Sequence, residues 1–174
     1  MDLSYPIGKF DFHQTIAPQA IPGLIQEIAA APALYRAAVR GLDDSQLDTP
    51  YRPGGWTVRQ TVHHVGDSHM NSFIRFRLAL TEDQPTICAY DQALWAELPD
   101  MRAVPVEVSL GLIESLHTRW TAMLQALAPA DFARTFRHPE IGVVRLDTTL
   151  ALYAWHGKHH AAHITGLRER MGWK

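Results

Sequence analysis

The sequence has little of what would decide its function by composition alone. A single cysteine, Cys88, excludes an internal disulfide. Eighteen acidic against sixteen basic side chains leave a formal net charge of −2, which excludes a strongly basic nucleic-acid-binding protein and gives no attraction to an anionic membrane. No apolar run approaches the roughly 18 residues of a membrane span, and the N-terminus lacks the apolar stretch of a signal peptide. We therefore expect a cytoplasmic protein that binds neither nucleic acid nor membrane.

The chain does contain enough apolar material for one folded unit. Its 174 residues, 47% of them hydrophobic, predict a single domain over residues 1–174 with a proper core. Prolines and glycines divide it into four stretches whose apolar residues recur every three to four positions, the period of an amphipathic helix. These stretches are residues 21–42, 57–80, 106–127 and 146–171. The expected fold class is all-α, a four-helix bundle with long crossover connections.

Local patterns add detail to this bundle. Pro32 either kinks the first helix or begins a second short one. Residues 87–105 have no sustained period and predict a long connection across the bundle, with a short helix at 92–97. Residues 135–145 fit a loop or a small hairpin. In the third helix the spacing predicts one buried face made of Val108, Leu112, Leu116, Trp120, Met123 and Leu127.

Histidine is the residue in excess, with ten copies. Seven of them lie in two short windows on the second and fourth predicted helices. The first window holds His63, His64 and His69, and the second holds His156, His159, His160 and His163. Two dense clusters so far apart in sequence point to one shared site.

On the fourth helix, His156 and His160 fall within the predicted buried stripe, one turn apart. Such an i, i+4 pair places two imidazoles side by side, as in helical zinc motifs. His159 and His163 have the same spacing, on a less apolar face that we expect to lie nearer the surface. A catalytic metal site takes three protein ligands and leaves a fourth position open, so the other window should supply a third histidine. We expect the remaining ligand N–H groups to meet a carboxylate, a carbonyl or water.

Periodicity does not choose the third ligand. His69 aligns with apolar neighbours, as a core histidine would, and His63 fits a peripheral position. His64 shares its face with the polar side chains of Thr61, Asp67, Ser68, Asn71 and Arg75. A polar stripe on a bundle helix either faces solvent or lines a polar pocket, which gives His64 a lead over its neighbours.

Two segments carry a more specific pattern, GGWTVRQTVHHVGDSHMNSFIRFRLALTEDQPTI and YAWHGKHHAAHI. With the opening SYPIG, the central WAELPD and the terminal LRERMGWK, they resemble the YfiT-like proteins of the DinB/YfiT superfamily. The resemblance implies a four-helix bundle that holds a divalent metal through three histidines. Trp56 is followed eight residues later by His64, and the distal HxxxH falls on His156 and His160. It also implies a homodimer, for which Trp95 and Leu98 are candidate contacts, and activities described as metal-dependent hydrolysis or transfer of thiols such as bacillithiol or mycothiol.

We therefore expect a metal-dependent enzyme with one divalent ion per chain, zinc or nickel, acting on a small molecule. A low-molecular-weight-thiol S-transferase is favoured. The alternatives are a hydrolase that uses metal-bound hydroxide and a non-catalytic metal-binding bundle with a closed, four-ligand site. The chain has no GxSxG, HExxH or glycine-rich phosphate loop, and its single thiol falls in a predicted loop. The nucleophile is therefore expected from outside, oriented by Asp67 or Asn71, one turn along from His64.

Overall fold

The four predicted helices all form in the computed structural model, which describes residues 2–173. They are α1 (Ile21–Val39), α3 (Val58–Thr81), α6 (Val106–Gln125) and α7 (Leu146–Met171). Short elements lie between them: η1 (Pro18–Ala20), α2 (Asp44–Leu47), α4 (Gln92–Trp95), α5 (Asp100–Ala103), η2 (Pro129–Ala133), β1 (Thr135–His138) and β2 (Gly142–Arg145). Within residues 2–173, no helix combines the length and the apolar character needed to cross a membrane.

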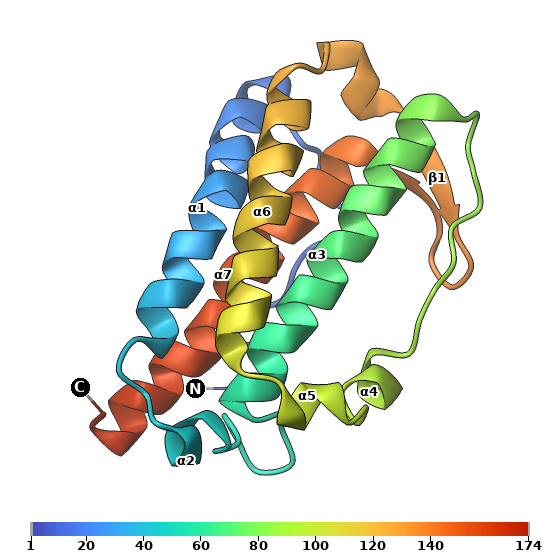
Figure 1. Ribbon diagram of the computed structural model, residues 1–174. Coiled ribbons are helices and arrows are strands. Elements are labelled where there is room, and N and C mark those ends of the chain that lie inside the picture. Colours follow the sequence, from blue (N-terminus) through green and yellow to red (C-terminus); the bar gives the residue numbers. More distant parts are fainter. Residues whose placement is uncertain (1, 174) are drawn as a thin grey trace.

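The long helices form a bundle in which α1 and α3 each pack against both α6 and α7. Figure 1 shows that α1 and α7 run in one direction, whereas α3 and α6 run in the other. Because α3 and α6 are parallel, the chain must return along the whole bundle between them, through residues 82–105 with α4 and α5. The predicted all-α, four-helix bundle with a long crossover is confirmed.

The first helix is continuous, with Pro32 in its interior. Proline has no N–H, so the carbonyl of Ile28, four residues earlier, loses its usual helical donor. The Nδ1 atom of His117 on α6 lies 2.7 Å from that carbonyl oxygen and replaces the missing donor. The helix α1 therefore continues through Pro32, and the buried carbonyl of Ile28 stays paired.

The buried face of α6 differs from the predicted one. Val108 and Leu112 are 60% and 40% exposed, and the buried residues are Val106, Leu110, Ile113, Leu116, His117, Trp120 and Leu124. The prediction followed a spacing of four from Val108 to Trp120, which puts its first two residues on the wrong face. Leu116 and Trp120 are buried as predicted, and Met123 and Leu127 are partly buried against the core. The true stripe includes a polar residue, His117, which an apolar count passes over.

Residues 135–145 form the hairpin rather than the loop. Strands β1 and β2 pair antiparallel, with Thr135 opposite Arg145 and His138 opposite Gly142. The backbone of Arg137 accepts from Ile87 N at 3.0 Å and donates to Pro85 O at 2.9 Å, so the hairpin fastens the start of the crossover.

Two apolar clusters fill the bundle, one centred on Phe76 and Trp120 and the other on Tyr35 and Ile164. On each of the four long helices, residues of one cluster give way to residues of the other near mid-length. Buried histidines occupy that level: His64 and His69 on α3, His117 on α6, and His160 on α7. The polar site is therefore set between two hydrophobic layers that hold the helices in place.

Candidate metal centre

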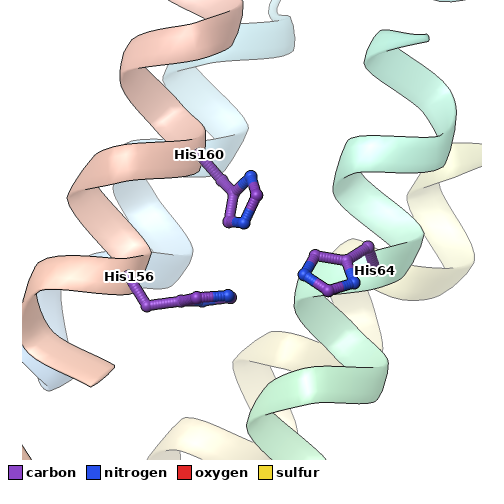
Figure 2. Close-up of side chains that lie close together, drawn as sticks. All are labelled: His64, His156 and His160. Atoms are coloured by element: carbon purple, nitrogen blue, oxygen red, sulfur yellow. The ribbon is translucent and has the colours of Figure 1, made fainter. Parts of the chain in front are cut away.

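His64 of α3 and His156 and His160 of α7 point toward one another (Figure 2). Each offers a ring nitrogen, and these nitrogens all lie within 4.8 Å of one another. The ring centroids of His156 and His160 are 4.5 Å apart, and the ring of His64 lies 4.9 Å from that of His160. The structure thus brings together the three residues that the sequence singled out.

The nitrogen atoms of this cluster suit a metal ion. Nε2 of His64 is buried and has no hydrogen-bond partner within residues 2–173, an unfavourable state for a polar atom unless something binds it. Burial lowers the pKa of His64 to about 4, with a smaller contribution from His159. Burial also holds the pKa values of His156 and His160 well below their usual range. Neutral imidazoles with free lone pairs are what a divalent ion requires.

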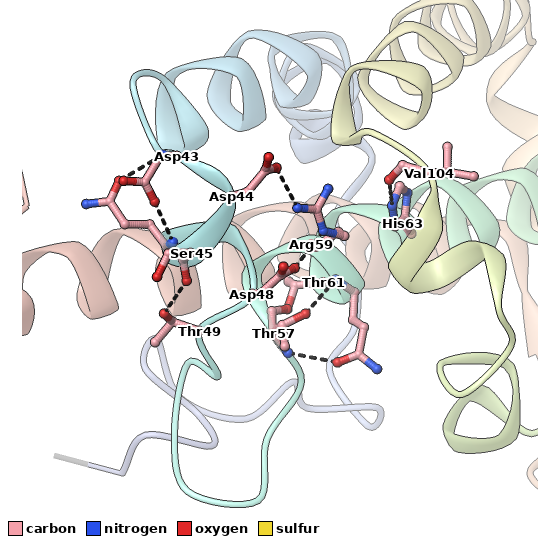
Figure 3. A network of polar contacts seen from close by, with 12 residues as sticks. Asp43, Asp44, Ser45, Asp48, Thr49, Thr57, Arg59, Thr61, His63 and Val104 are labelled. Atoms are coloured by element: carbon pink, nitrogen blue, oxygen red, sulfur yellow. Dashed lines mark hydrogen bonds and ion pairs between the residues drawn. The ribbon is translucent and has the colours of Figure 1, made fainter.

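His64 owes its position to a well-anchored start of α3. Thr57 caps the helix and forms a reciprocal capping box with Gln60 (3.1 and 3.0 Å). The ring of Trp56, in the preceding loop, lies 4.5 Å from the ring of His64. Arg59, only 6% exposed, binds Asp44 and Asp48 of the α2 segment at 2.8 and 2.7 Å (Figure 3). These contacts fix the end of the helix that carries His64.

Replacing Arg59 with alanine should lower the free energy of unfolding by about 2 kcal/mol, because two charge-assisted hydrogen bonds and a buried stem are lost. Arg36, an exposed arginine on α1 that binds Glu114 at 2.6 Å, is the matched control. Its alanine variant should lose much less, because an exposed ion pair contributes little to stability. Urea unfolding at pH 7 measures both, and equal losses would contradict the anchoring role.

A second group of three histidines overlaps the first. Nitrogens of His159, His160 and His163 also lie within 4.8 Å of one another, so His160 belongs to both groups. His159 and His163 are 6% and 3% exposed, and the expectation that they lie near the surface is wrong. The ring of His163 stacks on Tyr51 at 4.0 Å, and its Nε2 lies 3.3 Å from the carbonyl oxygen of Ser4. The N-terminal segment and the loop before α3 therefore cover a face that periodicity alone assigns to solvent.

Two cavities meet at His156. The first, of about 420 Å³, lies under Ser4, Tyr51 and Trp56 and is lined by all four histidines of α7. The second, of about 530 Å³, is lined by polar side chains that include Ser68, Arg75, Tyr90, His138 and Tyr153. Gln92 of α4 lines both cavities, so the crossover forms part of their wall. His156 therefore lines both cavities and His160 lines the first, whereas His64 lies behind them.

Residues 27–164 match the DinB superfamily. The chain belongs to the DinB superfamily. A Bacillus mycoides protein named "Putative metal-dependent hydrolase" is 57% identical over 172 residues, which cover 99% of each chain. A Bacillus cereus protein of the same name is 56% identical over the same length. Among solved structures, YfiT from Bacillus subtilis is similar over all of both chains, with a TM-score of 0.96 and 49% identity. It is described as "a probable metal-dependent hydrolase with an unusual four-helix bundle topology".

A further solved four-helix bundle protein, TT2238, has a TM-score of 0.56 and 19% identity over 86% of this chain. At that identity it supports the bundle fold alone.

The predicted orienting residues lie on α3, the helix that also carries His64. Asp67 and Asn71 line neither of the two cavities, and the side-chain nitrogen of Asn71 donates to the carbonyl of Asp67 at 2.9 Å. Partial burial, with a smaller contribution from Asp100, raises the pKa of Asp67 to about 6. Their roles stay a prediction.

The histidines outside the two groups of three include His63, His69 and His117, which are buried within the bundle. His63, expected at the periphery, is buried. It contacts Ser109 Oγ at 2.6 Å and Val104 O at 3.1 Å, which joins α3 to α6 and to the segment before α6 (Figure 3 shows the Val104 contact). His69 is fully buried, as its apolar neighbours indicate, but its ring also contacts that of His156. His117 escaped the sequence analysis because it stands alone in the chain. Its place in the buried stripe of α6 is the signal that could have found it.

Proposed function

We propose that this chain is a metal-dependent enzyme that holds one divalent ion, zinc or nickel, through His64, His156 and His160. In this proposal it transfers a low-molecular-weight thiol to a small electrophilic molecule. The observation that carries the proposal is the convergence of three uncharged imidazoles, one with an unpartnered buried nitrogen, beside two polar cavities that share His156 in their walls. The names of the DinB-superfamily relatives support metal dependence.

A divalent ion held by three histidines would supply an open position at which a thiol or a water loses its proton near neutral pH. The protein's own side chains offer no better nucleophile. Cys88 is exposed and lines neither cavity. The hydroxyl of Ser68 pairs with that of Tyr153 at 3.3 Å, with no histidine among its hydrogen-bond partners in residues 2–173. The incoming thiol would give its proton to solvent, and its sulfur would form the new bond to carbon. The carbon–chlorine bond of a chlorinated substrate would break, and chloride would leave with the bonding electrons.

The two cavities favour thiol transfer, because a transfer has two organic reactants to place and hydrolysis has one. Volumes of about 420 and 530 Å³ are each in the range of small-molecule sites. Polar walls, with Gln92 shared between them, would orient both reactants toward His156. Hydrolysis is the second candidate, and the names given to the relatives favour it.

Activity of the zinc- or nickel-loaded protein tests the reaction class, with a panel of thiols and a chlorinated electrophile run beside a panel of esters. We expect turnover in the thiol panel. Turnover of esters alone would assign the hydrolase. Metal binding without turnover of either panel would favour a non-catalytic bundle, in which His159 or His163 could close the site as a fourth ligand.

Cys88→Ser should keep most of the activity, because the nucleophile is external. Removal of the metal with a chelator should abolish activity, and added zinc or nickel should restore it. An inactive Cys88→Ser variant together with a metal-free wild type that still turns over would make the nucleophile internal and contradict the proposal.

We also propose that the protein is a homodimer. Leu94 and Leu98 on the crossover are 68% and 49% exposed, which supports a contact there, whereas Trp95 is partly covered by Tyr90 at 4.3 Å between ring centroids. Symmetric dimers are the commonest oligomers. Light scattering at micromolar concentration should give twice 19.6 kDa, and a mass of 19.6 kDa would contradict the dimer.

A further inference from the structure

Behind His156, a line of buried imidazoles crosses the bundle. Nδ1 of His156 lies 3.1 Å from Nε2 of His69, and Nδ1 of His69 lies 2.9 Å from Nε2 of His117. Nδ1 of His117 lies 2.7 Å from the carbonyl oxygen of Ile28 on α1. His69 and His117 are 0% and 1% exposed, so water does not compete for these contacts. The line joins all four long helices.

The carbonyl at the end of this line fixes the direction of every hydrogen bond in it. A carbonyl oxygen can only accept, so Nδ1 of His117 must carry the hydrogen. A neutral imidazole has one N–H, which leaves Nε2 of His117 as an acceptor from Nδ1–H of His69. By the same reasoning, Nε2 of His69 accepts from Nδ1–H of His156. The unprotonated nitrogen of His156 is then Nε2, the atom left to bind an ion.

The sequence keeps that carbonyl available. In an ordinary helix the carbonyl of Ile28 would accept from the N–H of residue 32, but residue 32 is proline. Because proline has no N–H, the carbonyl oxygen of Ile28 is free to accept from His117. The carbonyl that ends the line therefore belongs to α1, a helix that carries none of the three candidate ligands.

The other ligand on α7 has a similar partner at longer distance. Nδ1 of His160 lies 3.4 Å from Nδ1 of His163, whose Nε2 faces the carbonyl of Ser4 at 3.3 Å. A carbonyl again stands at the end of a histidine pair, and the same reasoning leaves Nε2 of His160 unprotonated. The expectation that ligand N–H groups meet a carboxylate, carbonyl or water directly is wrong here, since a histidine comes first.

We propose that His69 and His117 are positioning residues that hold His156 as its Nδ1–H tautomer and so direct its Nε2 to the metal. The proposal rests on the proposed function for the identity of the site, but it concerns the tautomer of His156 in the metal-free protein as well. Partners of this kind change metal affinity by about 10- to 100-fold.

Nitrogen-15 NMR of histidine-labelled, metal-free protein tests the tautomer directly. In the wild type, His156 should show a protonated Nδ1 and an unprotonated Nε2. His69→Phe keeps a buried ring and removes both hydrogen-bonding nitrogens, so His156 should become a mixture of tautomers. Cobalt affinity, followed by the visible spectrum, should fall about 10- to 100-fold in the same variant.

Two further variants separate positioning from simple loss of packing. His69→Gln retains an acceptor and a donor and should recover most of the cobalt affinity. His63→Phe changes another buried histidine of α3, which contacts Ser109 and Val104. It should leave both the tautomer of His156 and the cobalt affinity unchanged. Should His69→Phe fail to fold, His117→Phe provides the same test one residue further along the line.

A His156 that keeps its Nδ1–H tautomer in His69→Phe, or in His117→Phe, with cobalt affinity within about twofold of wild type, would overturn the proposal; the loss predicted for such a partner is about tenfold or more. Failure of the wild type to bind any metal would instead contradict the proposed function. The NMR measurement would still decide the tautomer in that case, so the two failures are distinguishable.

Discussion

Between about pH 6 and pH 4.5, the metal-free protein should lose stability by about 4 kcal/mol per pH unit. Burial lowers the pKa values of His64, His159 and His163 to about 4 in the folded state. In the unfolded chain each returns to about 6.5. Between these values these three histidines alone bind about three more protons in the unfolded state than in the folded state, at about 1.4 kcal/mol per proton and pH unit. Stability is therefore complete above pH 6.5 and falls as the pH falls toward 4.

This loss is comparable with the whole stability of a typical domain, about 5–15 kcal/mol. We expect cooperative acid unfolding near pH 5, measured as the shift of the urea midpoint between pH 7 and pH 5. His163→Gln should make the pH dependence shallower by about 1.4 kcal/mol per pH unit, because one titrating group is removed. His13→Gln, on the exposed N-terminal segment, is the control. A urea midpoint that does not move with pH would show that these histidines are not held neutral by burial.

Alanine at His156 should weaken zinc binding by more than about a hundredfold. Zinc sites with four ligands bind with about 10–16 kcal/mol, or about 3 kcal/mol per ligand. His64→Ala and His160→Ala should show losses of the same order, with helical content unchanged by circular dichroism. Competition with a chromophoric chelator measures the affinities.

His159→Ala is the informative comparison, because His159 is buried in the second histidine group but absent from the first. It should change zinc affinity by less than about tenfold, well below the loss of a ligand. If His159→Ala and His163→Ala lose more affinity than His64→Ala and His156→Ala, the ion binds the second group and the ligand assignment is wrong.

Helix positions were largely predictable because their signals are local. Thr57 begins α3 as a side-chain cap, and the apolar spacing after Leu146 carries through α7. The buried face of α6 was not, because His117 belongs to it as a hydrogen-bonded core residue. Apolar periodicity does not distinguish a satisfied buried imidazole from one that faces solvent.

Within the candidate site, the inward pair on α7 was predictable from spacing, whereas the surroundings of the pair were not. His159 and His163 are buried by Ser4, Tyr5 and Tyr51, which come from segments more than a hundred residues away. The choice of His64 over His69 was similarly open, since both are buried. What separates them is that His69 has a histidine on each side, whereas Nε2 of His64 has no partner within residues 2–173. Such pairing is a property of the assembled bundle.

Pro32 illustrates how stability and function can compete at a position remote from the chemistry. A proline inside a helix is about 3 kcal/mol less favourable than alanine, so a design that optimises α1 would replace it. The alanine would restore an N–H donor to the carbonyl of Ile28, on which His117 now depends. Thermostabilised variants of this protein should therefore be sought outside α1. Replacing Pro32 would stabilise the helix but weaken the hydrogen bond of His117, and with it the fixed direction of the hydrogen bonds between the histidines.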